Sequence, residues 1–246
     1  MELFIIISNN KNITMSEKIY TDENGEYLKN NPTWHVEDSP WKAKQIIKML
    51  SRNQISPISI AEVGCGAGEI LNQLHLSMPN NVCFTGYDIS SDAISLAKQR
   101  EKERLEFKQE NFLEINEKFD LLLMIDVFEH IDDYLGFLKL CKNKAKNTIF
   151  HIPLNISVQA ILRNKLILER NSFGHLHYFM KETAIATLVD SGYDIVDFFY
   201  TAGSLDLPRK KLKSKIAFLP RKVMFKTNQD IAATILGGFS LLVLTK

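Results

Sequence analysis

The segment ISIAEVGCGAGE, residues 58–69, restricts the possible folds more than any other part of this sequence. It begins as a short apolar run and then changes into a turn with glycines at 64, 66 and 68. Glycine adopts backbone angles that residues with a Cβ avoid, and it lets a ligand lie almost against the main chain. The pattern indicates a strand, a turn and a helix arranged around a small-molecule cofactor.

Glu62, two residues before the first glycine, indicates which cofactor the turn accepts. A dinucleotide turn reads G-x-G-x-x-G and presents helix N–H groups to a pyrophosphate. This turn reads G-x-G-x-G beside a carboxylate, which would repel phosphates and attract the ammonium and sulfonium charges of S-adenosylmethionine. Glycine-rich turns also occur as plain strand-to-helix connections.

With this acid and turn, the chain resembles the class I S-adenosylmethionine-dependent methyltransferases from about residue 38 to its end. Asp88 ends a second apolar run about twenty positions after the last glycine, where doubly wound folds place a ribose-binding carboxylate. The run FDLLLMIDVFEH, residues 119–130, suits a central parallel strand. Its D-V-x-E-H pattern is similar to that of a branch that includes quinone-biosynthesis O-methyltransferases.

The resemblance implies that S-adenosylmethionine is the cofactor. Asn111 stands where the family usually has an acid that accepts a hydrogen bond from the adenine amino group, and its amide oxygen can still accept. Phe112 either stacks on the adenine or belongs to the core. The expected cofactor-binding residues are Glu62, Gly64, Cys65, Gly66, Gly68, Asp88, Ile89, Asn111, Phe112, Asp126, Val127 and Glu129.

Histidines are the candidate catalytic bases. Methyl transfer depends on holding nucleophile and methyl in line, and a base is needed only when the nucleophile must lose a proton. We expect His130 and His175 to face the cofactor crevice, although a hydrogen-bonded structural role is the alternative for any single histidine. We expect His75 to be structural and His177 to point away. Glu129 and His130 with a histidine of segment 175–177 would also suit a metal, but our interpretation includes none.

The alternation of strand and helix patterns predicts a Rossmann-like α/β fold with a doubly wound, mostly parallel seven-stranded sheet. The resemblance implies that the last strand is antiparallel. Residues 1–37 are expected to form an N-terminal helical arm or lid, and residues 38–246 a single methyltransferase domain with inserted cap segments at about 154–177 and 203–228. We expect one helix over Ile156–Glu169, and only Gln229–Leu236 as a convincing helix between the last two strands. The expected strands cover residues 56–63, 82–88, 105–108, 119–125, 147–152, 193–200 and 239–245.

Positive charge gathers in one segment. Eight cations and no acid lie in residues 208–226, so a chain of net charge +1 carries −7 elsewhere. This segment is either a solvated loop or a contact surface for a membrane, an anionic substrate or RNA. We do not expect DNA as a partner. Three cysteines without metal-ligand or disulfide spacing favour the cytoplasm, with peripheral membrane association as an option.

The predicted function is an S-adenosylmethionine-dependent methyltransferase, O- or N-directed, acting on a small metabolite, a lipid-linked intermediate or a glycan. Trp34 and Trp41 precede the first strand and either shield the sulfonium or dock the arm. A nicotinamide-dependent oxidoreductase is one alternative, disfavoured by Glu62. The other is a catalytically silent binding module on the same fold.

Overall fold

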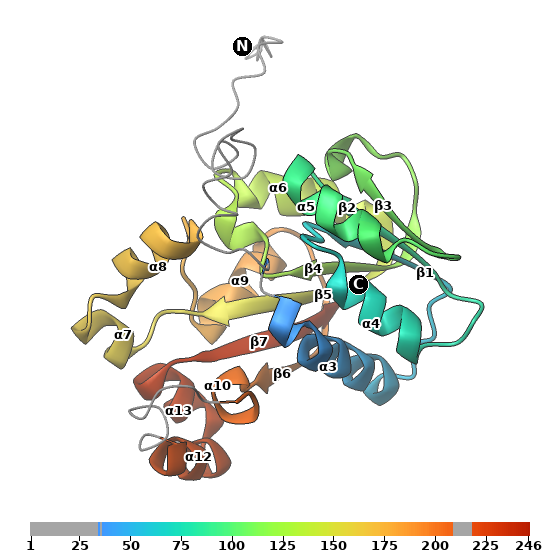
Figure 1. Ribbon diagram of the computed structural model, residues 1–246. Coiled ribbons are helices and arrows are strands. Elements are labelled where there is room, and N and C mark those ends of the chain that lie inside the picture. The colour runs from blue at the N-terminus through green and yellow to red at the C-terminus, as the bar shows by residue number, and fades with distance from the viewer. Residues whose placement is uncertain (1–33, 35, 209–217) are drawn as a thin grey trace, which may run out of the picture.

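The computed structural model describes Trp34 and residues 36–208 and 218–246 (Figure 1). Its centre is a seven-stranded sheet with the strand order β3-β2-β1-β4-β5-β7-β6. Neighbouring strands from β3 to β5 run parallel, whereas β7 is antiparallel to both β5 and β6. The predicted sheet is therefore confirmed. The strands are β1 (Ser59–Val63), β2 (Cys83–Asp88), β3 (Leu105–Gln109), β4 (Phe119–Ile125), β5 (Ala145–Leu154), β6 (Ile195–Thr201) and β7 (Phe239–Thr245).

Burial along the strands follows their place in the sheet. β4 lies between β1 and β5, and every one of its residues except Asp120 is buried, which explains its continuous apolar sequence. β6 lies at an edge, and its exposure alternates along the first residues. The order reverses at β1, whose neighbours β2 and β4 lead to helices on opposite faces. Open α/β sheets bind ligands at such a switch point.

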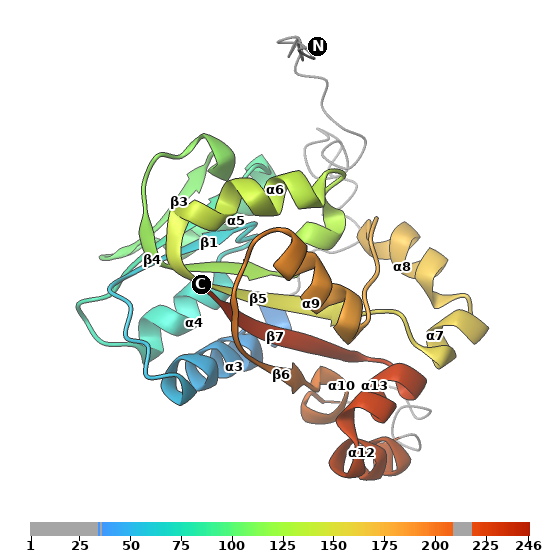
Figure 2. The same ribbon diagram turned by 180° about the vertical axis from the view of Figure 1, so that it is seen from behind.

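Helices cover both faces of the sheet. Apolar residues of α3, α4 and α5 form one core against it, and those of α6, α9 and α13 form the second core on the other side (Figures 1 and 2). None of the described helices is long and apolar enough to cross a bilayer. The helices are α3 (Ser39–Arg52), α4 (Glu69–Ser77), α5 (Ser91–Ala97), α6 (Tyr134–Cys141), α7 (Val158–Leu162), α8 (Lys165–Phe173), α9 (Lys181–Asp190), α10 (Gly203–Asp206), α12 (Phe218–Thr227) and α13 (Gln229–Leu236).

Two expectations about the inserted segments are wrong. The single helix expected over Ile156–Glu169 is two helices, α7 and α8. Asn164 between them adopts a left-handed conformation (φ 50°), which a right-handed helix cannot include. The last two strands are also separated by a second substantial helix, α12, which takes up the end of the basic segment. Residues 209–217 of that segment lie outside the described residues, as does the arm before Trp34.

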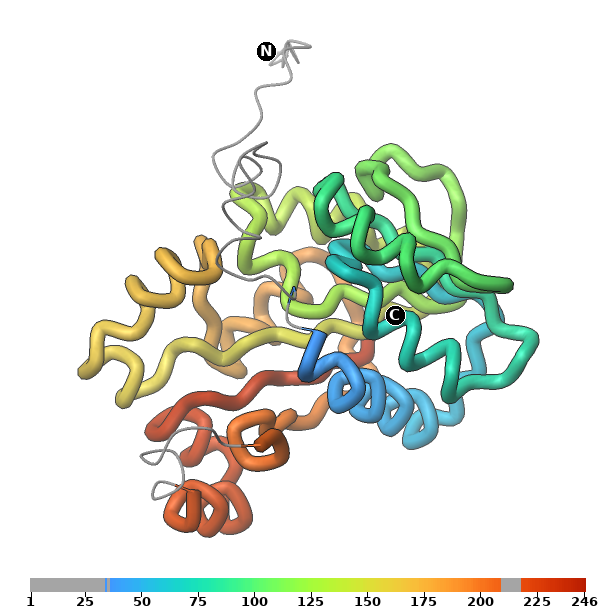
Figure 3. The backbone as a smooth tube through the Cα atoms, viewed as in Figure 1, coloured from blue at the N-terminus to red at the C-terminus, as the bar shows by residue number. Residues whose placement is uncertain are grey.

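Both insertions lie at the same end of the sheet. α7 follows the carboxyl end of β5, and α13 leads into the start of β7, where Phe239 pairs with Leu154. The backbone tube shows the α7–α8 segment in gold and the α12–α13 segment in red projecting from this end (Figure 3). Segments that are far apart in sequence therefore border the carboxyl ends of the parallel strands.

Close packing around Gly86 of β2 gives a test of the fold. A Cβ at this position would lie 2.5 Å from Phe107 Cδ1 and 2.9 Å from Cys65 Sγ. We expect Gly86→Ala to lower the free energy of unfolding by about 1–3 kcal/mol, the usual cost of overpacking, as measured by urea denaturation. Gly203→Ala is the control, since its Cβ would meet nothing closer than 3.4 Å. Equal stability of the two variants would contradict the packing described here.

Candidate active site

A cavity of about 720 Å³ opens at the carboxyl ends of β1, β2 and β4. Its volume lies within the range of small-molecule sites. Every residue predicted from the sequence for the site lines this cavity, except Gly68. Trp34 and Trp41 line it as well, so the segment before β1 forms part of the wall.

The glycine turn is left-handed at all three of its glycines, with φ of 67°, 53° and 77° at Gly64, Gly66 and Gly68. A Cβ on Gly66 would meet only Trp34, at 3.5 Å, so this glycine leaves the main chain open to a ligand. A Cβ on Gly68 would lie 2.4 Å from the ring of Phe107. The third glycine is therefore needed for helix–sheet packing, which explains why it does not line the cavity.

Asp88 holds the turn from the end of β2. Its carboxylate accepts hydrogen bonds from the backbone N–H of Gly66 and of Ser90, each at 2.9 Å. Burial raises the pKa of Asp88, and the backbone N–H donors oppose that shift. Each carboxylate oxygen keeps a second acceptor position, so Asp88 can fix the turn and still accept from a ligand.

Glu62 is a buried acid with one unsatisfied carboxyl oxygen among the described residues. Its side chain is 1% exposed, and Oε2 has no hydrogen-bond partner among the described residues. Burial raises the pKa of Glu62 well above its ordinary value, and the charge of Lys42 only partly opposes this. An orphaned carboxyl beside an open glycine turn fits the cationic groups of S-adenosylmethionine.

Asp126 is held by two partners that the sequence did not reveal. It follows β4 with φ 55°, and its carboxylate lies 2.8 Å from Lys42 Nζ and 2.6 Å from His151 Nδ1. Burial alone would raise the pKa of Asp126, but the charges of His151 and Lys42 outweigh it and leave the pKa well below its ordinary value. His151 Nε2 lies 2.9 Å from Thr201 Oγ1, and Lys42 also pairs with Asp38 at 3.1 Å. The expected cofactor contact of Asp126 therefore competes with strong internal partners.

Asn111 and Phe112, the residues expected near adenine, follow β3 and line the cavity. Asn111 Oδ1 accepts a hydrogen bond from Leu113 N at 3.1 Å and caps a short 3₁₀ helix, which uses one of its two acceptor positions. Phe112 is 2% exposed and contacts Tyr87 and Phe119 at centroid distances of 5.3 and 6.3 Å. Its ring belongs to the core, and the residue also lines the cavity.

The two remaining predicted contacts differ in exposure and packing. Ile89 is 39% exposed just beyond the end of β2. Val127 lies against the first glycine, because a Cβ on Gly64 would come within 2.9 Å of Val127 Cγ2. Val127 therefore fixes how closely the end of β4 approaches the turn.

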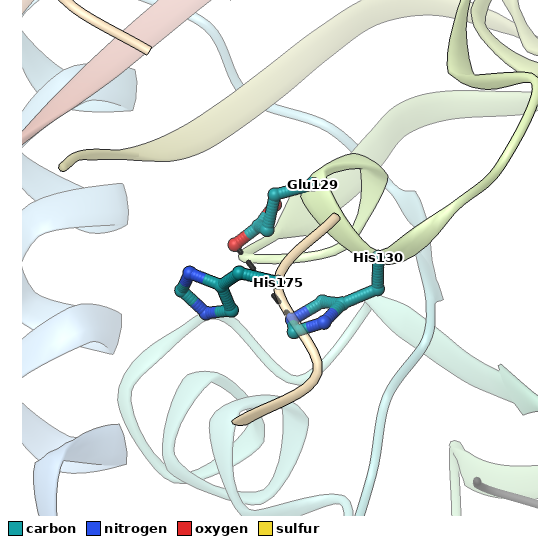
Figure 4. Close-up of side chains that lie close together, drawn as sticks. All are labelled: Glu129, His130 and His175. Carbon is teal, nitrogen blue, oxygen red and sulfur yellow. Dashed lines mark ion pairs between the residues drawn. The ribbon is translucent and has the colours of Figure 1, made fainter. Parts of the chain in front are cut away.

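Glu129, His130 and His175 converge on one wall of the cavity (Figure 4). His130 Nε2 lies 3.9 Å from Glu129 Oε1, and the two imidazole rings are 4.8 Å apart between centroids. Burial raises the pKa of Glu129, with Asp126 adding to the shift. Burial, reinforced by His175, lowers the pKa of His130 to about 4, and burial also lowers that of His175.

Backbone hydrogen bonds bring this trio together. The carbonyl of Glu129 accepts from the N–H groups of Leu176 and His177, at 2.8 and 3.0 Å, and so anchors the segment that carries His175. One atom from each of Glu129, His130 and His175 can be chosen so that all lie within 4.8 Å of one another. The arrangement offers neutral imidazoles as bases and, equally, a mixed oxygen and nitrogen set that a divalent metal could use.

His75 and His177 have structural partners. His177 Nε2 lies 2.9 Å from the carbonyl oxygen of Ile131, and His75 Nε2 lies 3.0 Å from that of Glu103. Neither lines the cavity. Lys42, in contrast, was missed as a site residue, because Lys42 and Asp38 at a spacing of four resemble an ordinary pair on a helix surface.

The cluster around Lys42 gives a prediction for stability. Lys42→Met would leave Asp126 with His151 as its remaining partner in the cluster, and we expect the free energy of unfolding at pH 7 to fall by about 2–3 kcal/mol. This is less than for a fully buried pair, because the Lys42 and Asp126 side chains are 14% and 27% exposed. Lys146→Met is the control, since Lys146 pairs with Asp120 at the surface with its side chain 76% exposed.

The same cluster predicts a pH dependence. The unfolded chain, whose Asp pKa is about 4, binds a proton that the folded Asp126 releases, so this stabilisation is present above pH about 5 and is lost as the pH falls. Denaturation between pH 3 and 7 should show a shallower acid slope for Lys42→Met than for the wild type. Identical slopes would show that Lys42 does not hold the charge of Asp126.

Comparison with known sequences gives the family. The family model described as a methyltransferase domain matches residues 56–183, slightly more than half of the chain. The ubiquinone biosynthesis O-methyltransferase of Actinobacillus pleuropneumoniae is 27% identical over 116 residues, which is 42% of this chain and 48% of that protein. The enzyme of the same name from Colwellia psychrerythraea is 28% identical over 137 residues, 52% of this chain and 54% of that protein. The chain thus matches about half the length of these curated relatives.

Solved structures with the same fold extend over nearly the whole chain. Magnesium protoporphyrin IX methyltransferase from Synechocystis, with bound SAH, has a TM-score of 0.59 at 13% identity and covers 94% of this chain and 96% of its own. The N-methyltransferase NodS from Bradyrhizobium japonicum, with S-adenosyl-L-homocysteine, has a TM-score of 0.57 at 18% identity and covers 90% and 94%. At these identities the likeness shows the fold alone. Together with the match over residues 56–183, it establishes that the chain belongs to the methyltransferase domain family, with the Rossmann-like fold of class I.

Proposed function

We propose that this protein is an S-adenosylmethionine-dependent methyltransferase that acts on an oxygen or nitrogen atom of a small-molecule acceptor. The observation that carries the proposal is the orphaned, buried Glu62 beside the open turn at Gly66, with Asp88 at the end of the next strand. A nicotinamide would bring phosphates to this turn, where a carboxylate opposes them. Family membership adds support for the methyltransferase and against the oxidoreductase.

In this proposal three residues make different contacts with the cofactor. Asp88 accepts from ribose hydroxyls, Gly66 exposes the main chain, and Glu62 attracts the cationic part of the cofactor. When bound, the cofactor supplies a methyl group on a positively charged sulfur. The methyl group must lie in line with the acceptor nucleophile, and this alignment depends on how rigidly the strand ends hold the cofactor and the acceptor.

The acceptor would enter at the wall formed by His130 and His175. Both imidazoles are neutral near pH 7, because their pKa values are lowered by burial, so either can take a proton from an acceptor hydroxyl or amine. The alternative on the same residues is a divalent metal that lowers the pKa of an acceptor hydroxyl. The two alternatives give different results when a chelator is added.

We also propose that the acceptor is lipid-linked and that residues 208–226 make a peripheral contact with the membrane. Support comes from the positive charge of this segment and from the relatives named for ubiquinone biosynthesis. Of these residues the structure describes Pro208 and the part of α12 up to Lys226. The cytoplasmic localisation likewise stays a prediction.

Cofactor binding can be tested at Glu62. We expect Glu62→Gln to weaken S-adenosylmethionine binding by about 1–3 kcal/mol, because the variant cannot carry the charge that a cation requires. Since burial raises the pKa of the free carboxyl, binding to the wild type should also release a proton, and the affinity should rise with pH. Calorimetry in two buffers with different ionisation enthalpies measures both effects.

The control for this experiment is Glu103→Gln, which changes an exposed acid that does not line the cavity. It should bind the cofactor as the wild type does. An unchanged affinity of Glu62→Gln, with the same proton release as the wild type, would remove Glu62 from the cofactor site.

Turnover can be tested at the histidines. If His130 or His175 is a base, its Ala variant should keep cofactor affinity and lose kcat by a factor of about 10²–10⁴. The assay is transfer of a labelled methyl group into fractionated cell extract, with His75→Ala as the control outside the cavity. Activity that disappears with a chelator and returns with a divalent ion would favour the metal. A folded protein that binds the cofactor and labels no acceptor in any fraction would support the silent binding module.

A further inference from the structure

The helical hairpin α7–α8 carries an unusual amount of exposed apolar surface. Val158, Ile161 and Leu162 of α7 are 47%, 55% and 79% exposed, and Ile167 and Leu168 of α8 are 53% and 58% exposed. These five large apolar side chains lie within residues 158–168. Scattered exposed apolar residues need no explanation, but a dense group of this kind marks an interaction site.

The hairpin contributes little to the core. α8 buries none of its side chains, and α7 buries only Ala160. Tyr178 Oη donates to the carbonyl oxygen of Leu166 at 2.9 Å and attaches α8 through its backbone. Figures 1 and 2 both show the hairpin projecting beyond the sheet. Its apolar residues are therefore not explained by the packing of the described chain.

Charge indicates what covers this surface. Residues 155–175 contain the cations Arg163, Lys165 and Arg170, and their single acid is Glu169. Glu169 pairs with Lys165 at 3.5 Å and also accepts a hydrogen bond from Asn155, so the charges of Lys165 and Glu169 offset each other. The positive charge that remains comes from Arg163 and Arg170, which are both exposed. The outer surface of the hairpin thus combines apolar side chains with positive charge.

The neighbouring helices have the same character. α13 packs against α7 and exposes Ile231 and Ile235, at 48% and 40%. α12 exposes Leu219 and Val223, at 65% and 56%, together with exposed Lys222. Apolar residues interspersed with cations are the composition of surfaces that bind anionic lipid interfaces.

We propose that the α7–α8 hairpin docks the protein onto an anionic lipid surface. Leu162, at the projecting end of α7, enters the boundary between headgroups and acyl chains with its apolar neighbours, and Arg163 and Arg170 lie at the lipid phosphates. A deformable lipid layer suits a projecting hairpin, whereas a protein partner would need a matching concave surface with acids.

Docking in this way would place the cavity at the membrane. Phe173 ends α8, and both Phe173 and His175 line the cavity. A lipid-linked acceptor could then reach the site without leaving the bilayer completely. This last consequence rests on the proposed function, but the docking itself does not.

The test is co-sedimentation of the full chain with vesicles, without acceptor or cofactor. The vesicles are phosphatidylcholine alone or phosphatidylcholine with phosphatidylglycerol. We expect binding to the anionic vesicles that weakens as salt rises. The double variant Leu162→Asp/Leu168→Asp should bind at least tenfold more weakly, and Arg163→Gln/Arg170→Gln should lose most of the dependence on phosphatidylglycerol. Leu76→Asp is the matched control, since Leu76 of α4 is 66% exposed on a part of the molecule distant from the hairpin and should bind like the wild type.

Two outcomes would overturn the proposal. One is equal binding to anionic vesicles by the wild type and the Leu162→Asp/Leu168→Asp variant. The other is failure of the wild type to bind these vesicles. If that wild type also elutes as a dimer while the variant elutes as a monomer, the hairpin is an interface between copies of the chain. Calorimetry with S-adenosylmethionine on the same variants separates this result from the proposed function, because the substituted residues lie outside the cavity.

Discussion

The burial of carboxyl groups at the carboxyl ends of the parallel strands is the constraint on which the rest of this structure depends. Parallel strands bring their ends to one edge, so Glu62 from β1 and the acids after β4 share a single cavity. Removing carboxylates from water is costly unless a cation or hydrogen-bond donors compensate. The fold compensates one of them internally, since Lys42 and His151 both contact Asp126. Glu62 and Glu129 remain with raised pKa values, and this leaves the site ready for a positively charged ligand.

Much of the fold, and the position of the glycine turn and Asp88 at one cavity, was predictable because it depends on local sequence. The turn at residues 64–68 needs glycine for its backbone angles and for close packing, and both requirements act within a few residues. The buried run of β4 likewise reflects its central position. Asp88 was located because the spacing between a first strand and the end of a second is set by one helix and two turns.

The expectations that failed, or that missed a residue, depend on longer-range effects. Asn164 lies between Arg163 and Lys165 in a stretch without glycine or proline, so we did not expect the break between α7 and α8. The expectation for α12 rested on the charge of residues 208–226 alone. The helix carries Arg221, Lys222 and Lys226, and Pro220 lies in its first turn, where proline is tolerated. The role of Lys42 follows from a contact between residues 84 positions apart, which a pattern in one sequence does not contain.

The antiparallel insertion of β7 has a consequence for how such a chain can diversify. Because β7 enters the sheet beside the end of β5, both inserted segments border one opening, while the turn at Gly66 and Asp88 belong to strands on the other half of the sheet. The glycine turn and the rim formed by these two segments are thereby separate parts of the molecule. Changes in the length or chemistry of the rim can alter which acceptor is admitted, without disturbing the strand ends at which we propose that the methyl donor binds.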